Sequence, residues 1–311
     1  MEIKLLTHNK IDFQKWDDTI LNARNSLVYA ESWYLNIVSP NWEALVLGDY
    51  EFVMPLPVKR KLGISFLIQP PLTQQLGIFS KQIIDEKIVE LFIKNIPYRS
   101  FHLNLNEQNL FGKGIPQPNL LLPLNKNYQM LFSNYSTNTK RNIKKAQQVE
   151  ISVSEEITPE QFLDFYFLAM NNEAKPDKNL TEKIVKTGFE KKKLKLYAAI
   201  QGKELTSVLC LLHSDKRLIY LLAASNEKGK KLSAMSLIVD KVIQDFAETN
   251  IYFDFEGSKV ETIARFYQGF GAEATTFPQI RKSNIVLISF SFLSKLKKKQ
   301  KKIIFAQSKN L

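Results

Sequence analysis

The sequence predicts a mixed α/β protein in which one domain plan occurs twice. Its 311 residues fit two domains of about 150 residues each, which is the usual domain size. Apolar residues recur with a period of two in some runs, as in strands, and with a period near 3.6 in others, as in helices. The same order of runs occurs in both halves, which favours an internal duplication.

The first half begins with an apolar strand, two amphipathic helices and a second strand. A Gly-Asp turn at residues 48–49 leads into two further strands, and a helix and a last strand follow. The predicted strands are 2–6, 42–48, 51–58, 63–70 and 101–106, and the predicted helices are 13–23, 30–38 and 82–95.

The second half repeats this order after a basic helix predicted around residues 137–148. Gly48 and Gly202, which mark the two central turns, are 154 positions apart, and Phe101 and Ile251, which start the last strands, are 150 apart. The predicted strands are 149–153, 194–200, 205–213, 217–225 and 252–257, and the predicted helices are 159–171, 180–191 and 236–249.

These elements predict two domains, each with a mixed, mostly antiparallel sheet flanked by helices. The predicted boundaries are an N-terminal domain at 1–135, a C-terminal domain at 136–290 and a basic tail at 291–311.

The net charge of +12 favours anionic partners. The run KLKKKQKK at 295–302 could lie on an anionic membrane surface, but a solvated tail is the preferred interpretation, since positive runs usually need no partner. Together with the lysines of 140–145, this run also fits a nucleic-acid-binding protein. The start of the chain has no pattern of a secretion signal, and no stretch reaches the ~18 apolar residues of a membrane span, so a cytoplasmic protein is expected.

Metal and thiol chemistry find little support in the sequence. Cys210 is the single cysteine and lies in an apolar run, which indicates a buried structural thiol. His8, His102 and His213 have no metal-ligand spacing, so no metal site is predicted.

Three stretches carry a resemblance to a known family: STNTKRNIKKA at 136–146, YLLAASNEKGKKLSAMSLIVDKVI at 220–243 and FDFEGSKVETIARFYQGFGAE at 253–273. They resemble the acyl-CoA N-acyltransferase (GNAT) fold in the tandem form of the FemABX peptidoglycan aminoacyltransferases and their BioF2-like relatives. The resemblance implies transfer of an acyl or aminoacyl group to an amine. It also implies acyl-CoA or aminoacyl-tRNA as the donor, with both domains lining the acceptor cleft.

The candidate catalytic residues are Asp254, Glu256 and Tyr267. The two acids alternate with phenylalanines, so one strand face should present both carboxylates to an acceptor ammonium that must lose a proton. A helix cap or a pair with Arg265 is the structural alternative. Tyr267 stands where the family usually has a lysine, and its hydroxyl either donates to the developing oxyanion or packs in the core.

The candidate donor site is the end of strand 217–225 and the loop after it, where backbone amides and lysines converge on an anionic donor tail. A solvated loop is the alternative, and a single glycine departs from the usual acetyl-CoA signature. The predicted donor-binding residues are Leu222, Ala223, Ala224, Ser225, Lys228, Gly229, Lys230 and Ser233.

The candidate acceptor site combines basic, turn and aromatic residues. The alternative for the basic residues is a solvated face, for the turn residues an ordinary turn, and for the aromatic residues core packing. The first half brings no cation at its equivalent loop and should bind no phosphate donor. The predicted acceptor residues are Lys140, Arg141, Lys144, Gly257, Ser258, Arg265, Phe266, Gln74, Tyr29 and Trp33.

The preferred hypothesis is an acyltransferase acting on a primary amine, with a peptidoglycan or other cell-envelope precursor as one acceptor class. A nucleic-acid-binding protein and a catalytically inactive GNAT-like scaffold are the alternatives.

Overall fold

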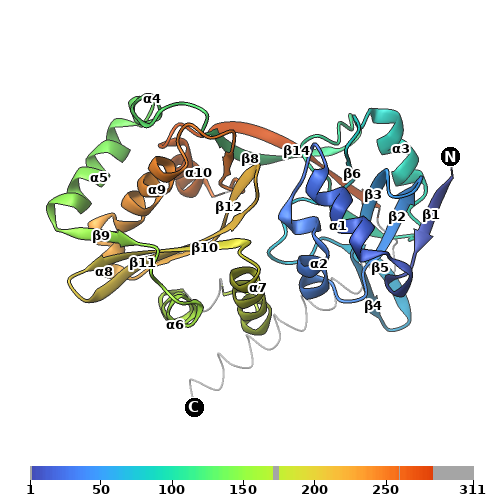
Figure 1. The fold of residues 1–311 in the computed structure, drawn as a ribbon, viewed down its shortest axis with the longest axis horizontal. Helices are drawn as coiled ribbons and strands as arrows, with labels where there is room; N and C mark the ends of the chain where they lie inside the picture. Colours follow the sequence, from blue (N-terminus) through green and yellow to red (C-terminus); the bar gives the residue numbers. More distant parts are fainter. Residues whose placement is uncertain (1, 171–174, 259, 283–311) are drawn as a thin grey trace, which may run out of the picture.

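The computed structural model describes residues 2–170, 175–258 and 260–282. Two α/β halves pack side by side, with the first half at the right and the second at the left in Figure 1. The predicted tail at 291–311, with its lysine run, and residues 283–290 of the predicted C-terminal domain lie outside the described residues.

The first half follows the predicted order of elements. Its helices are α1 (Phe13–Asn22), α2 (Ser32–Val38) and α3 (Glu86–Lys94), with two short 3-10 turns at His8–Lys10 and Val28–Ala30. Its strands are β1 (Ile3–Leu6), β2 (Glu43–Leu47), β3 (Phe52–Leu56), β4 (Val58–Lys61), β5 (Ile64–Ile68), β6 (Phe79–Ser80), β7 (Phe101–Asn104) and β8 (Ile115–Pro123).

The second half repeats this order and continues it. Its helices are α4 (Tyr128–Ser133), α5 (Thr137–Gln148), α6 (Pro159–Ala169), α7 (Lys178–Glu190), α8 (Glu227–Leu232), α9 (Ala234–Asp245) and α10 (Glu261–Gln268). Its strands are β9 (Ile151–Ser154), β10 (Leu194–Gln201), β11 (Glu204–His213), β12 (Arg217–Ser225), β13 (Tyr252–Asp254) and β14 (Glu273–Lys282).

Several helices begin at N-cap residues that can be recognised in the sequence. Asp12 accepts hydrogen bonds from the backbone N–H groups of Gln14 and Lys15 at the start of α1. Thr158 and Gln161 form a capping box at α6, and Ser136 accepts from the N–H of Thr139 at α5. These bonds satisfy N–H groups that a helix cannot pair internally, and they set where each helix begins.

One sheet runs through both halves. Its ten strands have the order β4-β5-β7-β14-β8-β13-β12-β11-β10-β9, and a separate four-stranded sheet has the order β1-β2-β3-β6. β14, the last strand of the second half, lies between β7 and β8, and β8 in turn pairs with β13, so these two strands bridge the halves (Figure 1). The predicted boundary at residue 135 falls between α4 and α5. The two halves nevertheless share backbone hydrogen bonds, because β14 pairs with β7 and β8, and β8 pairs with β13.

The predicted strand at 51–58 is divided in the structure. β3 ends at Leu56 in the four-stranded sheet, and β4 begins at Val58 in the ten-stranded sheet. Pro57 lies at the division, and because proline has no N–H to donate to a ladder, it suits a point where a strand leaves one sheet for another.

An apolar core also joins the halves. Buried Trp16, Tyr34 and Trp42 of the first half belong to the same cluster as Phe162 and Ile184 of the second. Two further clusters lie beneath α5 and α9 and beneath α3. Because the contact between the halves is a packed apolar interior, it fixes their arrangement and allows both to contribute to one site.

Candidate active site

The cavity of interest opens where β12 and β13 separate. The two strands pair in parallel only from Arg217 to Ile219 on β12, opposite Tyr252 to Asp254 on β13. Immediately afterwards Cys210 pairs with Leu222 while Leu211 pairs with Tyr220, so Leu221 is the extra residue of a β-bulge. A bulge bends its strand and increases the local twist, which explains why β12 turns away from β13 at this point.

A cavity of about 720 Å³ fills the angle between the strands. Beyond Ile219, β12 pairs only with β11 within the described part of the chain, so its other edge offers backbone groups to the cavity. The lining side chains are mostly apolar or aromatic: Tyr166, Ala169, Met170, Tyr220, Leu221, Leu222, Ala223, Ala224, Ser225, Lys230, Met235, Phe255, Glu256, Gly257, Thr262, Ile263, Phe266 and Tyr267.

Glu256 is the acidic residue of this cavity wall. Its backbone is in the left-handed region, with a φ of 57°, and burial raises the pKa of its carboxyl to about 8. The Tyr29 hydroxyl donates to the Glu256 carboxylate, and the Gln74 side-chain amide donates to the Glu256 carbonyl. Near neutral pH most of the carboxyl is therefore protonated, and the carboxylate form that can act as a general base grows as the pH rises towards 8.

Asp254 does not line this cavity. Its carboxylate is buried and pairs with Arg217 at 2.7 Å, and its Oδ1 accepts a hydrogen bond from the Glu256 N–H at 2.9 Å. The expectation that both acids share one strand face is wrong, because β13 ends at Asp254 and the left-handed backbone at Glu256 breaks the alternation.

Tyr267 lines the cavity next to Glu256. Its ring stacks on Phe255 at a centroid distance of 4.7 Å and meets Tyr220 at 5.3 Å. Burial, and then the charge of Glu256, raise the pKa of its hydroxyl, which therefore keeps its proton through the physiological range. The residue both packs in the aromatic wall and presents a hydrogen-bond donor to the cavity.

The predicted donor residues divide into two groups. Leu222, Ala223, Ala224, Ser225 and Lys230 line the cavity, whereas Lys228, Gly229 and Ser233 do not. Two exposed ion pairs hold the lysines, Lys228 with Glu204 at 2.6 Å and Lys230 with Glu227 at 2.7 Å. Exposed pairs are worth less than about 1 kcal/mol, so an anionic ligand can replace them.

Gly229 has a packing role. The segment expected to be a loop forms the short helix α8, and the Asn226 side chain accepts from the Gly229 N–H at 2.8 Å. A Cβ at Gly229 would lie 2.1 Å from the Thr206 carbonyl oxygen on β11. The glycine therefore allows α8 to pack directly on the sheet.

The first half reaches the site through its loop after β5 and through Tyr29. Asn104 on β7 ties down this loop, because its N–H donates to Gln69 at 3.0 Å and its side chain donates to the Gln74 carbonyl at 2.7 Å. Trp33 lies elsewhere: its indole N–H donates to Glu31 at 2.8 Å, and its ring lies against Gly188 of α7.

The basic residues of α5 do not line this cavity. The helix covers the outer flank of the second half, at the far left of Figure 1. Lys140 donates to the Ser133 carbonyl at 2.9 Å, Arg141 donates to Asn138 at 2.7 Å, and Lys144 is exposed. The expectation that these charges face an acceptor between the domains is wrong, because α5 packs on α9 on the side opposite the first half.

The segment after Glu256 closes one side of the cavity. Gly257 and Phe266 line it, whereas Ser258 accepts from the Val260 N–H at 3.0 Å and Arg265 forms an exposed pair with Glu261 at 2.6 Å.

Replacing Gly257 with alanine should destabilise the fold by about 1–3 kcal/mol. A Cβ there would lie 2.7 Å from both the Asn119 Cα and the Pro118 carbonyl oxygen, and φ is 57°. Gly202→Ala is the matched control, since Gly202 has a similar φ of 63° and nothing within 4 Å of a Cβ. Urea unfolding of both variants gives the comparison, and equal losses would show that the space at Gly257 has no role.

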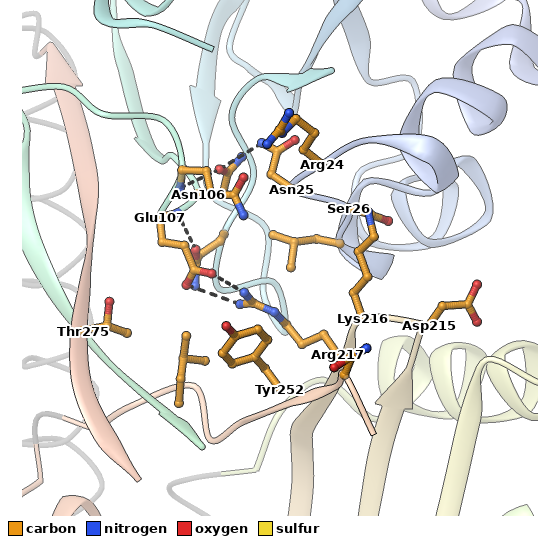
Figure 2. Close-up of a pocket in the computed structure, with 15 residues that line it drawn as sticks. Arg24, Asn25, Ser26, Asn106, Glu107, Asp215, Lys216, Arg217, Tyr252 and Thr275 are labelled. Carbon is orange, nitrogen blue, oxygen red and sulfur yellow. Dashed lines mark hydrogen bonds and ion pairs between the residues drawn. The ribbon is translucent and has the colours of Figure 1, made fainter. Parts of the chain in front are cut away.

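A second cavity of about 590 Å³ lies between the halves, and Figure 2 shows its lining. Arg217 is buried on its wall and contacts Glu107 of the first half as well as Asp254. Sequence reasoning missed the Glu107–Arg217 pair, because its partners are 110 positions apart and no local pattern connects them.

Neither a membrane span nor a metal centre occurs in residues 2–170, 175–258 and 260–282. The helices in these ranges are too short or too polar to cross a bilayer. The same ranges contain no group of three or more His, Cys, Asp or Glu side chains arranged to hold a metal ion.

Comparison with known proteins supports the same fold. Residues 133–262 match the family model described as acetyltransferase (GNAT) domain, and no curated protein matches the chain. The solved structure of FemX has a TM-score of 0.65 at 12% identity, covering 89% of this chain and 96% of FemX.

Two further structures show the same fold. The C-terminal domain of a protein assigned as a lysylphosphatidylglycerol synthetase from Agrobacterium fabrum has a TM-score of 0.59 at 9% identity, covering 91% of this chain and 96% of that one. A conserved protein of unknown function from Bacteroides thetaiotaomicron has a TM-score of 0.55 at 9% identity, covering 86% and 97%. The chain thus has a tandem GNAT-like fold similar to that of FemX, and its residues 133–262 are similar to the acetyltransferase (GNAT) domain family.

Proposed function

We propose that this protein transfers an acyl or aminoacyl group from a thioester or activated ester to a primary amine. The observation that carries the proposal is the buried Glu256 carboxyl in the wall of the β12–β13 cavity, whose lining also includes the part of β12 beyond Ile219, where one edge pairs with none of the described strands. The GNAT match over residues 133–262 and the likeness to FemX support the same class of reaction.

The donor lies along β12 in this proposal. Its carbonyl oxygen accepts hydrogen bonds from backbone N–H groups of the free edge between Leu222 and Ser225, which stabilise the oxyanion as it forms. The apolar lining from Met170, Met235 and Ile263 excludes water and surrounds the uncharged part of the donor. An anionic donor tail lies near Lys230 at the cavity wall.

Glu256 and Tyr267 manage the protons. The acceptor enters as an ammonium, Glu256 removes one proton, and the free amine attacks the carbonyl carbon. As the bond to the leaving group breaks, the leaving thiolate or alkoxide takes the proton of the Tyr267 hydroxyl, and the tyrosine recovers a proton from the new amide nitrogen. The product is an amide, and Glu256 is left as the neutral acid, which returns its proton to solvent before the next turnover.

Acyl-CoA and aminoacyl-tRNA remain the two donor classes. Lys230 of α8 lines the cavity, and the following Lys231, whose carbonyl accepts from Lys145 of α5 at 2.6 Å, extends a basic face along the outside of α8. This face suits either a phosphate-bearing cofactor tail or the backbone of a tRNA acceptor stem. The likeness to FemX makes a cell-envelope precursor with a free amine the first acceptor class to test.

The experiment is a transfer assay that offers acetyl-CoA, longer acyl-CoAs and charged tRNA separately with a panel of primary amines. Amide product from one donor class would support the proposal and identify the donor. A folded protein that yields no amide from any combination, yet binds RNA with a steep salt dependence, would favour the nucleic-acid-binding alternative instead.

The transfer rate should rise with pH, be half-maximal near pH 8 and level off at higher pH. The pKa of Glu256 is raised to about 8 by burial, so the basic carboxylate form becomes dominant only as the pH passes that value. A profile of kcat/KM between pH 6 and 10 measures the inflection in the free enzyme. A rate that is already level at pH 6 would mean that the buried carboxyl is not the base.

A further inference from the structure

Glu256 is held in a backbone conformation that an L-amino acid rarely adopts. Its φ of 57° lies in the left-handed region, and such a strained conformation persists only where the surroundings enforce it. Three groups of the residue are held: the carboxylate by the Tyr29 hydroxyl, the carbonyl by the Gln74 amide, and the N–H by Asp254 at 2.9 Å. Tyr29 and Gln74 both belong to the first half.

The third contact also leads back to the first half. Asp254 is 1% exposed, and its Oδ2 accepts from Arg217 at 2.7 Å. Arg217 is itself buried and donates to both carboxylate oxygens of Glu107, in the loop that follows β7. Figure 2 shows Arg217 and Glu107 facing one another on the wall of the second cavity. A continuous chain therefore runs from Glu107 through Arg217 and Asp254 to the Glu256 backbone.

The Glu107–Arg217–Asp254 chain has a cost in desolvation free energy, which suggests a role beyond stability. Arg217 and Asp254 are buried and Glu107 is partly buried, so all three lose hydration, and an apolar set of similar volume is often as stable. The Asp254 carboxylate accepts hydrogen bonds from the Arg217 guanidinium and from the Glu256 N–H. These bonds fix the position of the Glu256 backbone and therefore the direction in which its side chain points.

We propose that the Glu107–Arg217–Asp254 chain positions Glu256 for proton removal, so that the first half controls the reacting carboxylate of the second. Asp254 and Glu107 are then positioning residues, and neither touches the acyl donor or the amine. This inference rests on the proposed function for its catalytic consequence, but its structural consequence can be measured without turnover.

The test is a titration of the Glu256 carboxyl by ¹³C NMR, in protein with labelled glutamate side chains and with the Glu256→Gln variant to assign the signal. Asp254→Asn and Glu107→Gln each remove one negative charge, and each loosens the segment so that water reaches the carboxyl. Both effects lower the pKa of Glu256, and the midpoint should move about one pH unit lower. The ionisable side chains around this carboxyl are Tyr29, Tyr220, Tyr267, Lys230, Asp254, Arg217 and Glu107.

Glu43→Gln is the matched control. Glu43 is 5% exposed and has two partners, Arg60 at 2.8 Å and Tyr98 at 2.6 Å, but it lies on β2. Its loss should lower stability and leave the Glu256 midpoint unchanged. Asp254→Asn should also reduce kcat about 10-fold with little change in the KM of the donor, since a misplaced base slows chemistry and not binding.

Two results would overturn the inference. Asp254→Asn and Glu107→Gln proteins that fold, and in which Glu256 titrates as in the wild type, would show that the chain has only a structural role. A shift of equal size in Glu43→Gln would show that the midpoint follows general loosening. Because the titration needs no substrate, absence of transfer in the wild type would count against the proposed function alone.

Discussion

Glu256→Gln should lower kcat by about 10²–10⁴-fold, the range that a positioned general base contributes. Glutamine has nearly the same shape and keeps a hydrogen bond with Tyr29, but it cannot take a proton from the acceptor ammonium. Donor binding should be unchanged, because the donor lies along β12 and the substitution alters no lining volume. Steady-state kinetics, with donor affinity measured by calorimetry, separate the two effects.

The loss should not come from unfolding. Since burial raises the pKa of Glu256, ionisation of this group costs stability as the pH rises from the usual glutamate range through about 8. Glu256→Gln should therefore be as stable as the wild type below that range and more stable at pH 9. Glu261→Gln, an exposed acid at the start of α10, is the control and should retain full activity. An unchanged kcat in Glu256→Gln would remove this residue from the mechanism.

Arg217→Met should lower the free energy of unfolding by about 3–5 kcal/mol, which is the cost of removing one partner from a buried ion pair. Methionine fills a similar volume, but the buried Asp254 and the partly buried Glu107 would be left without their cation. Urea unfolding at pH 7 measures the loss.

The matched control is Arg265→Met, which removes the arginine of the exposed pair with Glu261 on α10. Exposed pairs contribute less than about 1 kcal/mol, so this variant should be close to the wild type. Equal stability of Arg217→Met and Arg265→Met would contradict the account of the buried chain.

Local sequence patterns were sufficient for most of the fold. Capping residues such as Asp12 and Ser136 mark helix starts because their hydrogen bonds are made within three positions. The duplication was visible because each copy repeats the same apolar periods. The shared ten-stranded sheet could not be predicted in this way. Its pairing of β14 with β7 joins residues such as Ile280 and Leu103, which no local period relates.

The candidate site could be predicted only where the position of a residue follows from its own strand. Residues whose position follows from one strand, such as Leu222 to Ser225, do line the cavity. The alternation rule failed at Glu256, because a tertiary contact with Asp254 and the left-handed φ override the period of two. The lysines of α5 were misplaced, since composition gives their charge but not the face of the molecule on which the helix packs.

The central claim is that the acyl donor occupies the angle between β12 and β13, and hydrogen exchange tests it most directly. With acetyl-CoA, longer acyl-CoAs or charged tRNA in excess, amide exchange should slow in peptides covering residues 220–225 and 255–257, at the free edge of β12 and around Glu256. Protection confined to the cavity of Figure 2, around Asn106 and Arg217, would contradict the account.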